Sequence, residues 1–289
     1  MISVIGIGGV GGPLVHALMQ ARIDTTVVVR PERLEHVRHD GLTLRNVDGQ
    51  STVYPQVALE PVPGSRVIVA VKAYSLADVL PEVVAAAPTE VLFLQNGVAH
   101  QELVHAAFGE TAACGSIRIV AHREPSGLVV QNSSYCQIEV PDRIAQWRLF
   151  QALQAAGAEI TTGGTEDQVL WRKLRFLAVL ALTTSWKDKG FGLARKEDPA
   201  AFHAMVEETA ALAAHAGLPT DPRELIGFME SLPDDTPSSL WLDVQRGGPT
   251  ELDALGTHLV ELGHRWGIAV PTLTQAVDAI GARLAAAPQ

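Results

Sequence analysis

The fold is decided by the stretch ISVIGIGGVG, residues Ile2–Gly11, where a short apolar run leads into a GxGxxG pattern. The three glycines of the pattern have separate uses: Gly6 permits a tight turn, Gly8 lets the backbone approach a pyrophosphate, and Gly11 lets the following helix pack against the strand. The N–H groups of that helix then face the phosphates. The predicted dinucleotide-binding loop comprises Gly6, Ile7, Gly8, Gly9, Val10 and Gly11.

Outward from this loop, the first half of the chain alternates short β-branched runs with helical patterns. Strands are predicted at Ile2–Ile5, Thr25–Arg30, Val67–Val71 and Val91–Leu94, and helices at Pro13–Ala21 and Leu76–Ala87. This alternation predicts an α/β fold with a parallel sheet covered on both faces. Two later runs, Leu128–Val130 and Gln137–Val140, are interpreted as an antiparallel extension of that sheet.

The second half is predicted to be almost entirely helical. Thr165 and Gln168 fit a capping box at the start of a long helix, and Asp198-Pro199 and Asp221-Pro222 fit helix N-caps followed by proline. A further helix is expected at Glu251–Trp266, ended by Gly267. We therefore expect a dinucleotide-binding domain at residues 1–164 and an all-helical domain at residues 165–289.

Composition narrows the classes of function. The net charge is −10 and no basic stripe occurs, so nucleic-acid binding is not expected. No apolar segment reaches the roughly 20 residues that a bilayer span needs, and no signal peptide is evident, which favours a cytoplasmic enzyme. The two cysteines form no CxxC pattern and the ten histidines no HxxxH or HExxH pattern, so no metal site is predicted.

The end of the second strand bears on the choice of cofactor. An NAD-binding enzyme usually places an acidic residue there to bind the ribose, whereas Arg30 could pair with the 2′-phosphate of NADP(H). Arg33 lies nearby in the sequence and adds to the positive charge. Glu32 argues the other way, because a small shift in register would make it the ribose ligand. The sequence favours NADP(H) and leaves NAD(H) open.

Polar residues also follow the third and fourth predicted strands. Lys72 comes directly after Val71, and Asn96 lies two residues after Leu94. Ligands of open parallel sheets bind outside the carboxyl ends of the strands. Lys72 is therefore a candidate for the cofactor ribose or phosphate, and Asn96 for the nicotinamide ribose or the substrate, although Asn-Gly is also an ordinary turn pair.

Two charged residues of the helical half are candidates for catalysis. Lys173 lies among leucines at helical spacing, and Glu251 lies in the first turn of a predicted helix. Desolvation would disfavour the ammonium form of Lys173 and make it a better proton donor to a carbonyl oxygen. Each residue also has an explanation without catalysis. Lys173 could extend its ammonium group to solvent, and Glu251 could complement the dipole of the helix that it begins.

Taken together, these pieces resemble the ketopantoate reductase (2-dehydropantoate 2-reductase) family, over nearly the whole chain. The matching pieces occur in the family's order: Gly6–Gly11, Arg30, Val71-Lys72-Ala73, Gln95-Asn96-Gly97, Leu170-Trp171-Arg172-Lys173-Leu174, Ser238-Ser239 with Asp243, Thr250-Glu251-Leu252-Asp253, and Gly267 with Pro271. The resemblance implies a Rossmann domain followed by a helical domain like the C-terminal domain of 6-phosphogluconate dehydrogenase.

The resemblance also implies roles for individual residues. Lys173 corresponds to the catalytic lysine, and Glu251 to a glutamate near the lysine and the nicotinamide ribose. Asn96 and Lys72 correspond to positions that contact the cofactor, with Asn96 also near the substrate. Ser239 corresponds to a serine that contacts the substrate. Ala121 corresponds to a backbone contact to the cofactor.

The implied activity is NADPH-dependent reduction of a small 2-oxo acid to a 2-hydroxy acid, as in pantothenate biosynthesis, by a chain that could form a homodimer. The sequence departs from the family at three positions that usually carry asparagine, here Leu177, Ala181 and Phe191. These replacements point to a more apolar pocket. Two alternatives therefore stay open: a reductase of a more apolar ketone or imine, and a non-catalytic NADP(H)-binding sensor.

Overall fold

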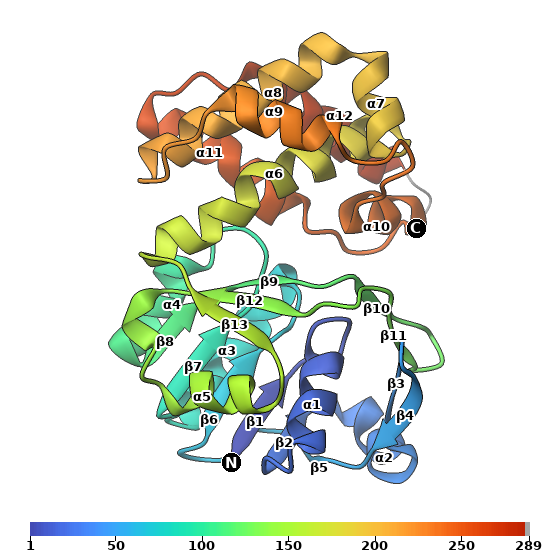
Figure 1. The fold of residues 1–289 in the computed structure, drawn as a ribbon, viewed down its shortest axis with the longest axis vertical. Coiled ribbons are helices and arrows are strands. Elements are labelled where there is room, and N and C mark those ends of the chain that lie inside the picture. The colour runs from blue at the N-terminus through green and yellow to red at the C-terminus, as the bar shows by residue number, and fades with distance from the viewer. Residues whose placement is uncertain (287–289) are drawn as a thin grey trace. The chain divides into compact units, whose positions relative to one another are not determined.

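The computed structural model describes residues 1–286, which form two compact units (Figure 1). One unit comprises Met1–Gln95 and His100–Val169. The other comprises Asn96–Ala99 and the chain from Leu170 onward. The short segment that begins at Asn96 thus packs with the second half of the chain, although it follows a strand of the first half. No helix among residues 1–286 combines the length and the apolar character of a membrane span.

A six-stranded parallel sheet forms the centre of the first unit. Its strands, in spatial order, are β5 (Gln56–Ala58), β2 (Thr25–Val28), β1 (Ile2–Ile5), β6 (Arg66–Val69), β7 (Glu90–Phe93) and β8 (Ala112–Cys114). The four predicted strands are confirmed, and three of them end one or two residues earlier than predicted. All residues of β1 and β2 are buried, as expected for strands of a parallel sheet that is covered on both faces.

Helices connect the strands of this sheet. They are α1 (Gly11–Gln20), α2 (Pro31–Asp40), α3 (Leu76–Ala85), α4 (Gln101–Phe108) and α5 (Arg148–Ala155), with short 3-10 turns η1 (Ala73–Ser75), η2 (Gly109–Thr111) and η3 (Asp142–Ile144). The predicted helices are α1 and α3. Residues Leu14, Val15 and Leu18 of α1 are almost fully buried in the core, together with Val4 and Val27 of the sheet.

The prediction that the later strands extend the central sheet is wrong. One small sheet has the order β10 (Ala121–Arg123), β11 (Val129–Gln131), β3 (Leu42–Asn46), β4 (Gly49–Val53), and another has the order β13 (Glu159–Thr162), β12 (Gln137–Val140), β9 (Ser116–Arg118). The backbone groups of β11 pair with β10 and β3, and those of β12 with β13 and β9. Because these backbone groups already have partners in the two small sheets, neither β11 nor β12 pairs with a strand of the central sheet.

The second unit is helical, and the first helix, α6, begins in the first unit. The helices are α6 (Glu166–Lys187), α7 (Phe191–Glu197), α8 (Pro199–His215), α9 (Pro222–Glu230), α10 (Ser239–Arg246), α11 (His258–Trp266) and α12 (Pro271–Ala286). The predicted capping box is confirmed, since the amide of Thr165 donates to Gln168 Oε1 at 3.0 Å and the amide of Gln168 to Thr165 Oγ1 at 3.3 Å. The side chains of Asp198 and Asp221 cap α8 and α9 as predicted.

The predicted helix Glu251–Trp266 is interrupted at its start. A π-helical turn, η4 (Asp253–Thr257), precedes α11, and Glu251 lies before it. The wider turn leaves Gly256 close to Leu182 and Val277, where an added Cβ would lie 3.0 and 2.7 Å from their methyl carbons. Gly267 ends α11 in a left-handed conformation with φ 69°, as predicted.

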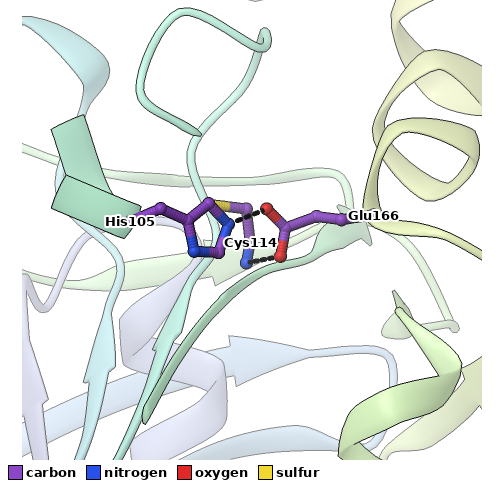
Figure 2. Close-up of side chains that lie close together, drawn as sticks. All are labelled: His105, Cys114 and Glu166. Carbon is purple, nitrogen blue, oxygen red and sulfur yellow. Dashed lines mark hydrogen bonds and ion pairs between the residues drawn. The ribbon is translucent and has the colours of Figure 1, made fainter. Parts of the chain in front are cut away.

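The first residue of α6 is held by hydrogen bonds from other elements of the first unit. Figure 2 shows that the carboxylate of Glu166 reaches both His105 of α4 and the backbone of Cys114 in β8. His105 Nε2 lies 2.6 Å from Glu166 Oε1, and the amide of Cys114 donates to Oε2 at 2.9 Å. The Glu166 side chain is only 11% exposed. These bonds fix the start of the helix that carries Lys173 two turns later.

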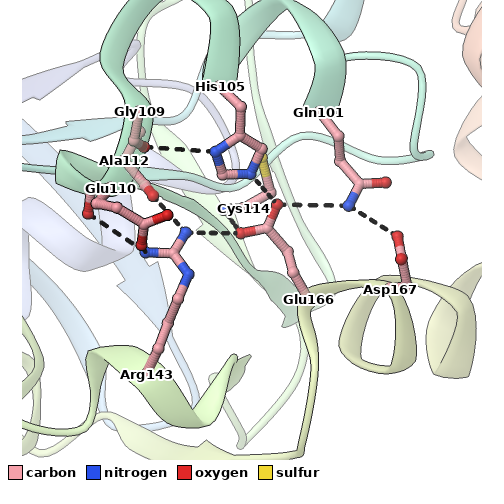
Figure 3. A network of polar contacts seen from close by, with 9 residues as sticks. All are labelled: Gln101, His105, Gly109, Glu110, Ala112, Cys114, Arg143, Glu166 and Asp167. Carbon is pink, nitrogen blue, oxygen red and sulfur yellow. Dashed lines mark hydrogen bonds and ion pairs between the residues drawn. The ribbon is translucent and has the colours of Figure 1, made fainter.

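A wider polar network surrounds the same carboxylate (Figure 3). Arg143 Nη2 lies 3.2 Å from Glu166 Oε2, and Gln101 Nε2 donates to Oε1 at 3.4 Å. Burial by itself would raise the pKa of Glu166. The hydrogen bonds from Cys114, His105 and Gln101 outweigh burial, and the pKa lies below its usual value.

Replacing Glu166 with Gln keeps the size of the side chain and removes its charge. We expect the Glu166→Gln variant to be about 1–3 kcal/mol less stable at pH 7, because buried hydrogen bonds to a carboxylate are lost. Since the folded-state pKa is lowered, the wild-type advantage is present above the unfolded pKa of about 4.3 and is lost as the pH falls through the folded-state value. Urea unfolding from pH 7 to pH 3 measures the difference.

The matched control is Glu82→Gln, at an exposed position of α3. We expect that substitution to change the stability by less than about 0.5 kcal/mol. A Glu166→Gln variant whose stability difference from wild type is the same at every pH would contradict a charged, hydrogen-bonded Glu166.

Candidate active site

The glycine loop between β1 and α1 has the geometry that its sequence predicts. Gly6 adopts φ 91°, and a Cβ there would lie 2.9 Å from the backbone of Ala70. A Cβ on Gly11 would lie 1.8 Å from the Gly6 carbonyl oxygen, so the helix can pack this close only with glycine. By contrast, a Cβ on Gly8 would have no neighbour within 4 Å. This open space beside Gly8 fits the approach of a pyrophosphate.

Strand β10 lies directly on the glycine loop. A Cβ on Gly9 would be 2.3 Å from the carbonyl oxygen of Ala121, the first residue of β10. Next along α1, a Cβ on Gly12 would be 2.8 Å from a methyl of Val129 in β11. Ala121, for which the family resemblance implies a backbone contact to the cofactor, therefore lies beside the loop. The contact itself stays a prediction.

The other cofactor candidates of the first unit lie after their strands, as predicted. Arg30 follows β2, is exposed, and is the N-cap residue of α2. Lys72 follows β6, is half-buried, and is the N-cap residue of η1. The buried Gln95, which follows the neighbouring strand β7, donates from Nε2 to the carbonyl oxygens of Val69 and Val71 at 3.0 and 3.1 Å. Gln95 therefore fixes the backbone that leads to Lys72.

Three predicted site residues meet in the helical unit. Lys173 Nζ donates to Asn96 Oδ1 at 2.8 Å, and Asn96 Nδ2 donates to Glu251 Oε2 at 3.1 Å. Glu251 is only 3% exposed, and Lys173 and Asn96 are partly buried. One amide group thus links an ammonium donor to a buried carboxylate. An amide suits this place because it accepts from the cation and donates to the anion at the same time.

Gly97 brings Asn96 to this position. Its backbone has φ 84°, and an added Cβ would lie 2.6 Å from the carbonyl oxygen of Ala254 in η4. The Asn96–Gly97 backbone therefore approaches the π-helical turn too closely for a residue with a side chain. The Asn-Gly pair thus forms a turn, and the contact of Asn96 with the cofactor or the substrate stays a prediction.

The face of α6 that carries Lys173 continues with apolar residues. Leu177 and Ala181 follow at spacings of four and eight, and Thr184 lies one further turn along the same face. Thr184 Oγ1 is 2.7 Å from Ser238 Oγ, and Ser238 also accepts from the amide of Trp241 at 3.0 Å as the N-cap of α10. Along this face, the charged Lys173 is followed by two apolar residues and then by the hydroxyl groups of Thr184 and Ser238.

Ser239 and Phe191 are the two remaining positions for which the family resemblance implies a substrate contact. Ser239, the predicted substrate contact, is the exposed first residue of α10, next to Ser238. Phe191 is fully buried and packs edge-on against Phe202, with ring centroids 5.7 Å apart. Phe191 thus belongs to the core of the helical unit. Where the family usually carries an asparagine, this chain has a packed aromatic side chain.

One group of side chains in the first unit has metal-ligand chemistry. The ligand atoms of His105, Cys114 and Glu166 lie within 4.8 Å of one another. Both Glu166 oxygens already accept hydrogen bonds, and the guanidinium of Arg143 contributes a positive charge beside them. Burial, followed by the charge of Glu166, raises the pKa of the Cys114 thiol well above its usual value. We assign these residues to the anchoring of α6, and the absence of a bound metal stays a prediction.

Comparisons with known proteins bear on the whole chain. Residues 2–144 match the family described as ketopantoate reductase PanE/ApbA, and residues 167–283 match its C-terminal domain. The chain belongs to the ketopantoate reductase family. Members of this family are oxidoreductases that reduce a 2-oxo acid with a nicotinamide cofactor, and the present chain shares that general activity.

Individual relatives of this ketopantoate reductase family member cover nearly its full length. An uncharacterized oxidoreductase, YkpB of Bacillus subtilis strain 168, is 27% identical over 93% of this chain and 94% of its own. A D-mandelate dehydrogenase with NADH and anilino(oxo)acetate is similar in structure with a TM-score of 0.88, at 19% identity over 99% of both chains. A PanE/ApbA family ketopantoate reductase from Ralstonia eutropha JMP134 has a TM-score of 0.87 at 24% identity, over 99% of both chains. At these identities the two structures show the shared fold.

Substituting Gly97 with Ala tests whether the close approach to Ala254 holds Asn96 in place. The added methyl group must displace the Asn96 backbone, so we expect kcat to fall by about 10²-fold, the usual cost of an ångström-scale displacement of a catalytic group. Steady-state oxidation of the reduced nicotinamide cofactor measures this effect.

Gly247→Ala is the control, because Gly247 also has a positive φ, 67°, but a Cβ there would have no neighbour within 4 Å. It shares the backbone strain and lacks the crowding. Equal losses of kcat in both variants would show that strain alone, without displacement of Asn96, explains the result.

Proposed function

We propose that this protein is an NADPH-dependent reductase of 2-oxo acids in which Lys173 donates the proton. The observation that carries the proposal is the hydrogen-bonded series from Lys173 through Asn96 to the buried Glu251, at 2.8 and 3.1 Å. Residues 1–164 would bind the cofactor and residues 165–289 would supply the catalytic lysine. A cytoplasmic location and a homodimer are further predictions from the sequence.

The glycine loop supports a bound dinucleotide. The space beside Gly8 and the close packing at Gly6 and Gly11 are those that a pyrophosphate-binding turn needs. The loop also presents the N-terminus of α1 to an anion. The nicotinamide, when bound, supplies the hydride that reduces the carbonyl carbon.

The residues of the helical unit supply the rest of the chemistry. Lys173 transfers a proton to the carbonyl oxygen as negative charge develops there, so the ketone becomes a hydroxyl group. Asn96 accepts from the ammonium group and fixes its direction. Glu251 accepts from the other end of the Asn96 amide and so fixes the amide's orientation. Asn96 and Glu251 are also proposed to contact the nicotinamide ribose, and Ser239 the substrate.

The choice of NADP(H) over NAD(H) follows from Arg30. Its exposed position directly after β2 is where a 2′-phosphate or a ribose hydroxyl would lie. A guanidinium suits the phosphate, because it can form two parallel charge-assisted hydrogen bonds.

Two kinds of 2-oxo acid are candidates for the substrate. Small 2-oxo acids such as 2-dehydropantoate, whose reduction serves pantothenate biosynthesis, are the family's expected substrates. Leu177 and Ala181 on the Lys173 face favour a second candidate, a 2-oxo acid with an apolar or aromatic side chain. The half-buried Leu177 offers apolar contact area, and neither it nor Ala181, which is only 1% exposed, offers a hydrogen bond to a substrate hydroxyl. An aromatic 2-oxo acid therefore fits this face better than 2-dehydropantoate.

The Lys173→Met variant tests the assigned proton donor. We expect kcat to fall by about 10²- to 10⁴-fold, the usual contribution of a positioned general acid, with the Kd for NADPH within about threefold of wild type. Stopped-flow turnover and NADPH fluorescence titration provide the two values.

The control for this variant is Lys196→Met, which removes an exposed lysine that pairs with Asp234 at 2.6 Å. It should keep the wild-type kcat. A Lys173→Met enzyme of normal kcat would rule out Lys173 as the donor, and NADPH binding by the wild type without turnover of any 2-oxo acid would favour a non-catalytic sensor.

A substrate panel tests the apolar face of α6. We expect the wild type to have a higher kcat/KM for phenylglyoxylate than for 2-dehydropantoate. In the Leu177→Asn/Ala181→Asn double variant, the ratio of these two values should shift towards 2-dehydropantoate by about tenfold or more, because the amides can bind its hydroxyl group. A wild-type preference for 2-dehydropantoate would contradict the apolar assignment.

A further inference from the structure

Three arginines gather at one end of the first unit. Arg30 is the N-cap residue of α2 and Arg33 lies in its first turn, where the amide of Arg33 donates to the carbonyl of Arg30 at 2.9 Å. Arg123 is the last residue of β10. Arg123 lies 90 or more residues further along the chain than the other two, and no sequence pattern linked it to the cofactor.

The β10–β11 turn brings these segments together. At Gly127, in this turn, a Cβ would lie 2.9 Å from Arg33 Nη2 and 3.1 Å from His36 Nε2. The turn itself closes through the amide of Glu124, which donates to the carbonyl of Leu128 at 2.8 Å. The Arg33 guanidinium therefore lies against the turn that begins next to Arg123.

The cluster has an excess of positive charge. Among residues 1–286, no carboxylate forms an ion pair with Arg30, Arg33 or Arg123, and the buried Nε of Arg33 has no hydrogen-bond partner. Desolvation, followed by the charges of Arg33 and Arg30, lowers the pKa of Arg123. A protein of net charge −10 thus keeps three like charges close together without neutralising them. Such an arrangement is stabilised by an anion.

The position of the cluster identifies the anion. The carbonyl group of Ala121 at the start of β10 lies on Gly9 of the glycine loop, and Arg123 lies two residues further along the strand, with its side chain on the same face of β10 as that of Ala121. Two residues of strand span roughly 7 Å. In a dinucleotide, the 2′-phosphate is separated from the pyrophosphate by the adenosine ribose, which is a comparable length. Strand β10 therefore leads from the pyrophosphate loop towards a 2′-phosphate.

We propose that Arg123 and Arg33 complete the 2′-phosphate site begun by Arg30, and that Arg123 makes the enzyme discriminate NADPH from NADH. The inference rests on the proposed NADPH dependence. A phosphate dianion between three guanidiniums accepts charge-assisted hydrogen bonds and removes their mutual repulsion. The β10–β11 turn then takes part in the choice between NADPH and NADH, which is usually decided at the end of the second strand.

Binding of adenosine fragments to the full-length protein tests this inference without turnover. Isothermal titration calorimetry with 2′,5′-ADP and with 5′-ADP isolates the contribution of the 2′-phosphate. We expect the Arg123→Gln variant to bind 2′,5′-ADP about tenfold more weakly than wild type and 5′-ADP with an affinity within twofold of wild type. The ratio of kcat/KM for NADPH to that for NADH should fall by a similar factor.

Arg38→Gln is the matched control, because it removes the same charge from α2 at an exposed arginine that pairs with Glu35 at 2.9 Å. It should leave both affinities within twofold of wild type. An Arg123→Gln variant that binds both fragments as wild type does, or loses affinity for both equally, would overturn the inference. Equal wild-type affinities for the two fragments would instead refute the proposed NADPH preference, and the role of Arg123 with it.

Discussion

The proposed chemistry depends on the two hydrogen bonds of the Asn96 side-chain amide. It accepts from Lys173 and donates to Glu251, residues that are 77 and 155 positions away in the chain. An ammonium group and a buried carboxylate are thereby held in fixed positions by a neutral group with one acceptor and one donor end. The amide can occupy this place because Gly97 lets its backbone approach Ala254.

Much of the first unit could be predicted from the sequence. Short apolar runs such as Val91–Leu94, alternating with helical patterns, are typical of a parallel sheet, so the central strands could be predicted. The strands of the small sheets were harder, because three residues such as Ala121–Arg123 carry too little pattern to define their partners. The π-helical turn at Asp253–Thr257 was also missed, since the spacing of apolar residues there is compatible with an ordinary helix.

The site was predicted residue by residue, but its geometry was not. Lys173, Asn96 and Glu251 were singled out by their positions, and the resemblance to a family gave them roles. Nothing in the sequence alone gives contacts across 155 residues. Gly97 was a usable signal, because a glycine after a polar residue at a strand end often marks a close approach. Arg123 and the anchoring of Glu166 by His105 had no such signal, since both depend on pairing between distant segments.

In the proposed reaction the two units have different tasks. The first unit offers a glycine loop and three unneutralised arginines, which suit an anionic cofactor. The second offers a directed lysine on a helix face that is apolar beyond it, which suits a carbonyl with an apolar substituent. Family membership gives the reaction class, and these local features narrow the cofactor and the substrate.

Chemical rescue is the most direct test of Lys173 as the proton donor. In the Lys173→Gly variant, single-turnover oxidation of NADPH by a 2-oxo acid can be followed with added primary amines of different pKa. The account predicts that small alkylammonium ions restore the rate and that more acidic ones restore it more effectively. A Lys173→Gly enzyme that transfers hydride at the wild-type rate, or whose restored rate is independent of the pKa of the amine, would contradict it.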